Sequence, residues 1–351
     1  MLKAISTCTI LILLATSVYS KVDGEYCYAL ALEGGGDKGA YQAGALAQII
    51  EDSDADEIQY DVVSGVSVGS INAGFLAGFS KGQELEAVEE MLKNWEGLTS
   101  KNIYKDWPWG GPVRGIFNEK SLYDSSPFRE YITKALSPPK RGIIVSATNA
   151  ATGVQKTWDE TTEWSTLLKA IDASSSFPGF FTPVTDIDEG VTYYDGGVSY
   201  SVNIFGAINK CVDRGFDYNH IVIDVIMCTG ATVSDKNISN YRTLPMVLRY
   251  LEIERYFDSM ELLERALYDF TGVNFRYLVA PTEKIEPGLI PMDFDHKQIM
   301  KMIEIGRSDA KKAMKLGHGK NFKNVLAFHD KKMNGKFSGG FGEYLKIKNE
   351  N

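Results

Sequence analysis

Ser67 is the side chain of this sequence best placed to act as a nucleophile, because it is the serine of a G-x-S-x-G motif from Gly65 to Gly69. A short apolar run, 61–63, precedes the motif and a run of small residues, 70–74, follows it. This order predicts that a strand turns sharply into a helix at the serine, with glycines where a Cβ would clash. Five-residue motifs also occur by chance, and a helix start without catalysis is the alternative interpretation.

A second candidate is the glycine-rich loop that runs from Gly34 to Gly39, after the apolar run 27–32. Consecutive glycines let several backbone N–H groups point into one concavity, and a helix that begins directly afterwards adds positive potential, so the loop predicts an anion site. The anion could be a nucleotide phosphate, although the loop lacks the lysine-serine or lysine-threonine ending of a P-loop. It could instead be the oxyanion formed when Ser67 attacks an ester. A turn without a ligand is the third interpretation.

The third candidate is Asp195, which directly precedes Gly196 and Gly197. An aspartate followed by glycine most often marks only a turn. An aspartate at the end of a strand, with glycines that leave room beside it, can also contact a serine hydroxyl and accept its proton. Asp195 is therefore the candidate general base for Ser67, since such partners need to meet only in the fold.

These three motifs, in this order, resemble those of the patatin-like phospholipase family, which has G-G-G-x-[K/R]-G, then G-x-S-x-G, then D-G-[G/A]. The block 173–178 is similar to the family's A-S-x-A-x-P, and the resemblance extends from about Cys27 to about Lys315. It implies an α/β fold of three layers, with a mainly parallel central sheet and helices on both faces. Two positions depart from the family pattern, Ser176 and Ile204, and they leave the shape of the substrate pocket open.

The resemblance also implies a reaction and a role for each motif. Ser67 and Asp195 would form the catalytic dyad of a lipid acyl hydrolase, most directly a phospholipase A. The oxyanion hole would comprise Gly34, Gly35, Gly36, Lys38 and Gly39, and the nucleophile elbow Gly65 and Gly69. Lys38 would steady the loop or attract anionic headgroups. The expected substrate is a phospholipid or another acyl lipid, met transiently at a membrane or micelle surface, and no cofactor is expected.

Two other functions are compatible with the same motifs. An α/β-hydrolase esterase would need a catalytic histidine. The candidates are His220, His296, His318 and His329. A non-catalytic lipid-binding or storage protein could keep the fold without turnover. The histidines show no metal-ligand spacing, so we expect no metal site.

The first 20 residues predict a secretory signal peptide. Lys3 precedes the apolar run 10–15, which is too short to span a bilayer, and 18–20 offers small or aliphatic residues for cleavage. An uncleaved N-terminal anchor is the alternative. We therefore expect a protein of the secretory pathway, either secreted or in an endomembrane lumen. Cleavage would leave Cys27, Cys211 and Cys228, so at most one disulfide can form within the chain.

The rest of the chain divides into one domain and a tail. The domain, 21–330, reads as one large patatin-like acyl hydrolase unit, since 44% of the chain is hydrophobic and no repeat or long linker divides it. The tail, 331–351, is basic and predicts a flexible extension that could approach anionic lipid. The net charge of -9 and the lack of a matching fold motif argue against nucleic-acid binding.

Hydrophobic periodicity predicts the elements that must position these motifs. Strands are expected at 27–32, 61–64, 142–147, 220–228 and 275–280, and helices at 39–51, from Ser67 onwards, and at 202–212, 245–270 and 296–314. Their alternation favours a mainly parallel sheet with the site at the carboxyl ends of its strands. Two aromatic clusters, 107–117 and 177–181, could contact lipid, but we expect both to close over the core.

Overall fold

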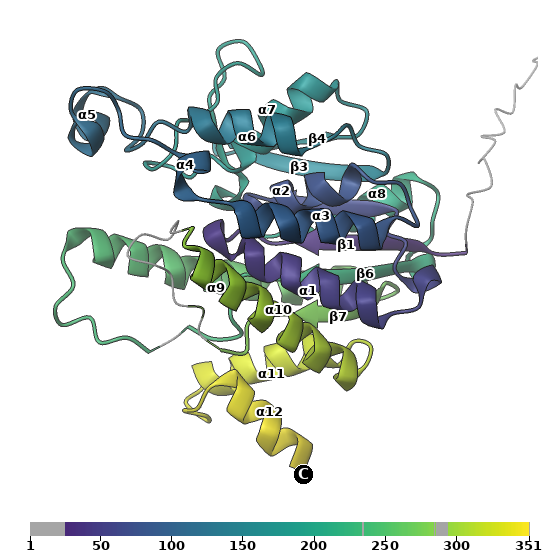
Figure 1. Cartoon of the computed structure of the whole chain (residues 1–351). Coiled ribbons are helices and arrows are strands. Elements are labelled where there is room, and N and C mark those ends of the chain that lie inside the picture. Colours follow the sequence, from purple (N-terminus) through teal and green to yellow (C-terminus); the bar gives the residue numbers. More distant parts are fainter. Residues whose placement is uncertain (1–24, 234, 284, 286–293, 351) are drawn as a thin grey trace, which may run out of the picture.

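The computed structural model describes residues 25–233, 235–283, 285 and 294–350, and the expected signal peptide, 1–20, lies outside them. Within the described chain, seven strands form one sheet in the order β4-β3-β2-β1-β6-β7, with β5 paired to β3 (Figure 1). The strands are β1 (Cys27–Leu32), β2 (Val62–Val66), β3 (Gly142–Asn149), β4 (Gln155–Asp159), β5 (Tyr193–Asp195), β6 (Ile221–Ile226) and β7 (Asn274–Val279). The sheet is mainly parallel, as predicted, because only β4 and β5 run antiparallel to their neighbour.

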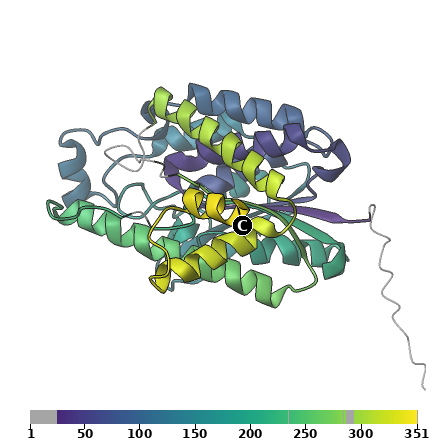
Figure 2. The same cartoon turned by 90° about the horizontal axis from the view of Figure 1, so that it is seen from below.

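The parallel strands are buried on both faces, which explains why they are apolar at nearly every position. In β1, Leu30 and Leu32 pack into one apolar cluster, whereas Ala29 and Ala31 pack into another. The helices are α1 (Gly39–Asp52), α2 (Val68–Ala77), α3 (Glu84–Gly97), α4 (Ser100–Ile103), α5 (Gly111–Asn118), α6 (Ser126–Ala135), α7 (Trp164–Ser174), α8 (Ile204–Asp213), α9 (Thr243–Asp269), α10 (His296–Leu316), α11 (Lys320–Met333) and α12 (Phe341–Glu350). Residues of α1, α2, α3, α7 and α10 belong to the first cluster, and residues of α8, α9, α11 and α12 to the second (Figure 2). This is a three-layer α/β fold.

The sequence predicts β1, α1 and α9 to within a few residues of their observed bounds. It does not predict β4 or α7, and it anticipates β5 only by considering Asp195 at the end of a strand. β4 is an edge strand with mostly polar, partly exposed residues, and β5 has only three residues. Neither carries the periodicity on which the prediction depends.

The C-terminal residues differ from the flexible extension expected at 331–351. α11 continues to Met333, and α12 packs back onto it through Phe341 and Tyr344, whose rings contact Phe328 (Figure 1). The apolar residues of this segment are few, but they recur at helical spacing and share one face. The numerous lysines around them obscured that pattern in the sequence.

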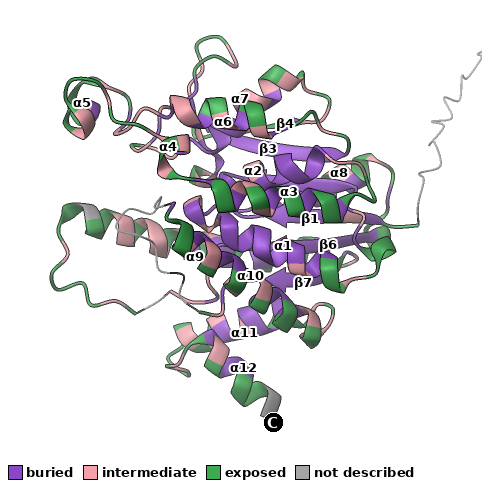
Figure 3. Cartoon of the chain, in the orientation of Figure 1, coloured by how far each residue is buried: buried purple, intermediate pink, exposed green. Residues whose placement is uncertain are grey.

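The aromatic cluster at 107–117 also differs from expectation. Trp109 is 97% exposed and Phe117 is 79% exposed, on α5 and the turn before it, so these side chains do not close over the core. Figure 3 shows α5 as a largely exposed element that projects from the body of the protein. Phe177 and Phe181, in contrast, pack against the core as expected. Among the described helices, none combines the length and apolar character needed to cross a membrane.

One disulfide joins Cys27 in β1 to Cys211 in α8, and Cys228 is a buried free thiol. The sequence allows one such bond but does not choose the pair. The pairing links the first strand of the sheet to a helix on its second face, 184 residues later in the chain.

Candidate active site

Ser67 lies at the turn between β2 and α2, at the carboxyl end of a central strand. Its φ of 53° is left-handed, a conformation that is strained for a residue other than glycine. Gly65 and Gly69 permit the turn, because a Cβ on Gly65 would lie 2.2 Å from the carbonyl oxygen of Gly69. A Cβ on Gly69 would lie 2.4 Å from the carbonyl oxygen of Leu32. Both glycines of the motif are thus required by the close approach of backbones.

Asp195 ends β5, and its carboxylate contacts the serine. Ser67 Oγ donates a hydrogen bond of 2.6 Å to Oδ2, and the N–H of Gly197 donates one of 2.7 Å to Oδ1. Burial raises the pKa of Asp195 to about 6, against the opposing effects of the Ser67 hydrogen bond, the positive charge of Arg255 and the Gly197 hydrogen bond. A carboxylate with this pKa accepts a proton more readily than a solvated aspartate and is still ionised at neutral pH.

Serines at the end of α7 hold the strained turn in place. The N–H of Ser67 donates to Ser174 Oγ at 2.9 Å, and Ser175 Oγ donates to the Ser67 carbonyl oxygen at 3.1 Å. The backbone N–H and carbonyl oxygen of Ser67 are therefore both bonded to side chains more than a hundred residues away. The sequence prediction missed this role, although a run of three serines before a proline was a visible signal.

Ser176, where the sequence departs from the family pattern, does not line the pocket. Its hydroxyl donates to the carbonyl oxygens of Asp172 and Thr182, and its own carbonyl oxygen accepts the N–H of Asp195. The departure therefore concerns the packing behind Asp195, and the pocket wall is formed by other residues.

The glycine loop lies beside the serine, since a Cβ on Gly34 would be 3.0 Å from Ser67 Cβ. Several of its N–H groups already have acceptors. The N–H of Gly34 donates to the carbonyl oxygen of Ser201, and those of Lys38 and Gly39 donate to carbonyl oxygens within the loop. These three groups are occupied in the free protein.

The N–H groups of Gly35 and Gly36 have no acceptor among the residues that the structure describes. Gly36 has a φ of 63°, which favours glycine. A Cβ on Gly35 would lie 2.3 Å from Cys228 Cβ, so a larger residue does not fit there. The loop thus presents two backbone donors beside the serine, an arrangement suited to a developing oxyanion.

Glu33, the residue before the glycines, attaches the loop to the neighbouring strand and to α9. Its Oε2 accepts the N–H groups of Cys228 and Thr229, and its Oε1 accepts the hydroxyl of Ser259. Burial raises the pKa of this carboxyl, and the hydrogen bonds from Ser259 and Thr229 oppose the rise. The prediction from sequence missed Glu33, although a charged residue at the end of an apolar strand must find partners inside the fold.

A second buried network holds the loop from the helices. Gln42 Nε2 donates to the carbonyl oxygen of Glu33, and Asn72 Nδ2 donates to that of Gly39. Trp95 Nε1 in turn donates to Asn72 Oδ1. One side chain from each of α1, α2 and α3 therefore contributes to the position of the loop.

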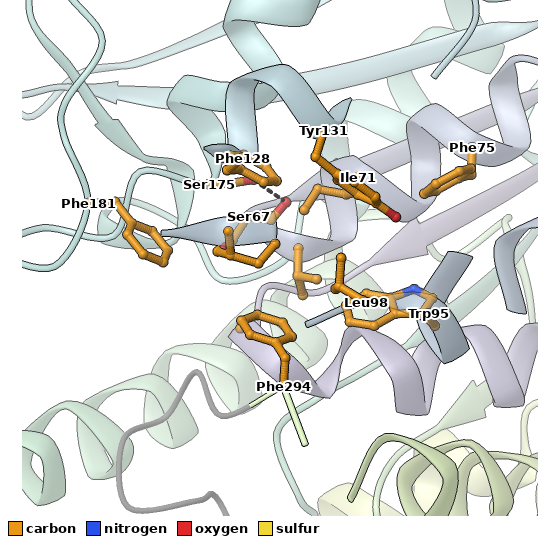
Figure 4. A pocket seen from close by; sticks show the side chains of 13 residues that line it. Ser67, Ile71, Phe75, Trp95, Leu98, Phe128, Tyr131, Ser175, Phe181 and Phe294 are labelled. Atoms are coloured by element: carbon orange, nitrogen blue, oxygen red, sulfur yellow. Dashed lines mark hydrogen bonds between the residues drawn. The ribbon is translucent and has the colours of Figure 1, made fainter. Parts of the chain in front are cut away.

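An apolar cavity opens beside Ser67 and extends between α2, α3 and α6 (Figure 4). Its wall includes Ile71, Phe75, Trp95, Leu98, Phe128 and Tyr131. None of the described residues that line it is charged. A cavity of this character suits a hydrocarbon chain.

The four histidines have their contacts away from the dyad. His296, His318, His329 and His220 contact the Glu96 carbonyl oxygen, Tyr277, Tyr256 and Tyr26, respectively. None of these contacts involves Ser67 or Asp195. Within the described part of the chain, no group of three or more His, Cys, Asp or Glu side chains could hold a metal ion.

Comparison with known proteins gives one family match. The model of the family described as Patatin-like phospholipase matches residues 30–208, a range that contains Ser67, Asp195 and the glycine loop. Fourteen chains of solved structures match significantly. One of them is the crystal structure of VipD from Legionella pneumophila, with 13% identity, a TM-score of 0.38, and coverage of 84% of this chain and 67% of that chain. A likeness at this TM-score carries no argument of its own. No curated protein sequence matches significantly.

Proposed function

Because the chain belongs to the patatin-like phospholipase family, whose members are lipid acyl hydrolases, we propose that it is a phospholipase A with Ser67 as nucleophile and Asp195 as base. The observation that carries this proposal is the 2.6 Å hydrogen bond from Ser67 Oγ to Asp195 Oδ2, next to an apolar cavity. The hydrogen bond gives the hydroxyl proton an acceptor at the position where the serine must lose it.

In the first half of the reaction, Ser67 Oγ attacks the carbonyl carbon of the ester as its proton passes to Asp195. The carbonyl oxygen becomes an oxyanion that accepts the N–H groups of Gly35 and Gly36. The tetrahedral intermediate collapses, and the bond to the alcohol breaks. The alcohol, a lysophospholipid, takes the proton from Asp195 and leaves an acyl group on Ser67.

In the second half, water attacks the acyl group and gives a proton to Asp195. The new tetrahedral intermediate uses the same two backbone donors. It collapses to release the fatty acid, and the proton returns to Ser67 Oγ. The sequence places five residues of the loop in the oxyanion hole, and we now propose only the N–H groups of Gly35 and Gly36. The backbone N–H groups of Gly34, Lys38 and Gly39 already donate to other carbonyl oxygens.

We propose that the substrate is drawn from a lipid surface, with its acyl chain in the apolar cavity. The exposed side chains of α5 support this, because aromatic and aliphatic groups on a projecting helix can enter the interfacial region of a bilayer. Figures 1 and 2 show α5 and the start of α9 projecting past the same edge of the sheet. The strands β1 and β2 end at this edge, and the nucleophile follows β2.

The proposed compartment is outside the cytosol, as the apolar N-terminal run suggests. The disulfide between Cys27 and Cys211 supports this, because disulfides persist mainly in oxidising compartments. N-terminal sequencing of the exported protein should find a start near Lys21; a cytosolic product that begins at Met1 would contradict it.

The decisive experiment incubates the mature protein with vesicles of mixed phospholipids and identifies the products by mass spectrometry. We expect free fatty acid and lysophospholipid. Ser67→Ala should lower the rate by about four decades or more and abolish labelling by a fluorophosphonate. The control is Ser53→Ala, at the end of α1, which should behave as the wild type.

The other two functions predict different outcomes of the same experiment. An esterase with a Ser-His-acid triad would lose as much activity on replacement of one histidine as on Ser67→Ala, while Asp195→Asn kept substantial turnover. A binding or storage protein would retain lipid without releasing any product. Either result would replace the phospholipase assignment.

A further inference from the structure

Arg255 lies on α9 and is not among the residues that line the apolar cavity. A Cβ added to Gly197 would be 3.0 Å from Asp195 Oδ1 and 3.8 Å from Arg255 Nη2, so both groups border the same small space. The side chain of Arg255 is partly buried and therefore still reaches solvent. A cation thus stands next to the proposed base, in a chain whose net charge is -9.

The guanidinium of Arg255 has no hydrogen bond or ion pair among the residues that the structure describes. The neighbouring carboxylates have other partners. Asp195 accepts from Ser67 and Gly197, and Glu33 accepts from two backbone N–H groups and a serine hydroxyl. Asp258, one turn further along α9, accepts the N–H of Ser201. The five N–H donors of Arg255 therefore remain available for a ligand.

Lys38, the second cation near the glycine loop, differs in this respect. Its Nζ donates to the carbonyl oxygen of Cys228 at 3.3 Å. Lys38 thus has a partner within the protein, whereas Arg255 does not. Arg255 is also the better shaped of the two for a phosphate, because its planar fork can form two parallel hydrogen bonds to one oxyanion.

We propose that Arg255 binds the phosphate of the phospholipid headgroup while the acyl chain occupies the apolar cavity. In a glycerophospholipid the phosphate and the ester are separated only by the glycerol carbons, so a phosphate site next to the dyad suits such a substrate. The assignment rests on the proposed function, because it orients the same ester at the same serine. It makes Arg255 the residue that distinguishes phospholipids from neutral glycerides.

A different role for Arg255 would be to balance the charge of the two buried carboxylates. Its positive charge opposes the rise in the pKa of Asp195 and of Glu33, in each case as a smaller effect than burial. In that role Arg255 would affect every ester to the same extent, whatever the headgroup. The two roles therefore separate when the same acyl group is presented on a lipid with a phosphate and on one without.

The test compares two substrates with the same acyl chains, phosphatidylcholine and diacylglycerol, in the same neutral detergent micelles. We expect Arg255→Gln to raise KM for phosphatidylcholine by about tenfold to a hundredfold, the range for a lost charge-assisted hydrogen bond. The values for diacylglycerol should stay within about twofold, and Arg255→Lys should be intermediate because it keeps the charge but loses the fork. Equal losses on both substrates would overturn the proposal.

The control on the same helix is Arg265→Gln, whose exposed side chain pairs with Asp269 and should affect neither substrate. Thermal unfolding of each variant checks that the fold is retained. Inorganic phosphate distinguishes a headgroup site from a site for the free ion. If phosphate inhibits the wild type but Arg255→Gln leaves KM for phosphatidylcholine unchanged, the site belongs to the free ion and the headgroup assignment is wrong.

A binding measurement keeps the proposal independent of hydrolysis. Calorimetric titration with a short-chain ether-linked phosphatidylcholine, below its micelle concentration, should show binding about tenfold or more weaker in Arg255→Gln than in the wild type. The matching dialkylglycerol should bind both proteins alike. If neither ester substrate is hydrolysed but this difference holds, the proposed function fails and the phosphate site stands. Equal binding of the ether lipid by both proteins would refute the site itself.

Discussion

Asp195 must be ionised to accept a proton from Ser67, and its burial sets the pH at which this happens. Its pKa of about 6 predicts that kcat/KM falls about tenfold per pH unit below pH 6 and levels off above it. Asp195→Asn should abolish this pH dependence and should also lower the rate by several decades. The measurement is a pH profile on a neutral monomeric ester, which avoids titration of a headgroup. A profile that is flat from pH 4 to pH 8 would contradict the role of Asp195.

Ionisation of Asp195, which should raise the activity, should lower the stability of the fold. The pKa of Asp195 is raised from 3.8 to about 6 on folding, so the folded protein binds the proton more tightly than the unfolded chain. The stabilising contribution is complete below about pH 4 and is lost as the pH rises through about 6. It is worth roughly 3 kcal/mol at most. Chemical unfolding of wild type and Asp195→Asn at pH 4 and pH 7.5 should show that this loss is confined to the wild type.

Gly36 tests whether the backbone donors act in catalysis. Gly36→Ala places an alanine at a φ of 63°, and Gly190→Ala does the same at a φ of 71° on the surface, where no atom lies within 4 Å of the added Cβ. Both should lose stability, by about 1–3 kcal/mol. Only Gly36→Ala should lose turnover, by about two to three decades, because it displaces an oxyanion donor. Equal turnover in the two variants would make the glycine loop structural.

The sequence could predict the site roles of the motif residues but not those of the residues that surround them. Ser67, Asp195 and the glycines occur in short local motifs, in which glycine is needed at fixed positions so that the backbone can turn. Sequence alone could therefore predict that these residues lie close together. Glu33, Ser174 and Arg255 act through contacts with segments far away in the chain. No local spacing encodes such contacts, and only the fold brings them together.

Among the elements, the buried strands could be predicted because burial on both faces leaves a run of apolar residues in the sequence. The long helices could be predicted because one buried face leaves apolar residues at helical spacing. α5 shows the limit of this reasoning. Its three large apolar side chains, Val113, Ile116 and Phe117, are of the kind expected in a core, yet all three are exposed. Sequence identifies an amphipathic or apolar segment but not the surface that covers it, and here no described segment does so.

The exposed face of α5 should matter on vesicles and not on soluble esters. We expect Trp109→Ser combined with Phe117→Ser to weaken binding to phospholipid vesicles by at least about tenfold, since burial of one large apolar side chain is worth about 1.5–3 kcal/mol. Hydrolysis of a short-chain monomeric ester should be unchanged. The control is Tyr268→Ser. Tyr268 is about as exposed as Phe117 but lies near the C-terminal end of α9, whereas the N-terminal end of α9 is the one that projects with α5. Unchanged sedimentation with vesicles would exclude α5 as a lipid-binding element.

For the molecule as a whole, charge is distributed unevenly around the proposed lipid surface. The chain has a net charge of -9. The segment 101–120, which includes α5, instead carries four cations, Lys101, Lys105, Arg114 and Lys120, against Asp106 and Glu119. A locally basic, apolar projection on an acidic protein favours approach to an anionic surface by this end. The basic C-terminal residues lie on α11 and α12, at a different part of the fold (Figure 1).

The disulfide determines how strongly the stability of the whole fold depends on its compartment. The bond between Cys27 and Cys211 closes a loop of 184 residues, and cross-links of long loops restrict the unfolded chain most. Replacement of both cysteines by alanine should lower the free energy of unfolding by about 2–4 kcal/mol. A reductant should lower the Tm of the wild type towards that of the double variant and leave the double variant unchanged. If the reductant lowers the Tm of both proteins equally, its effect does not pass through this bond, and the cross-link is not what stabilises the fold.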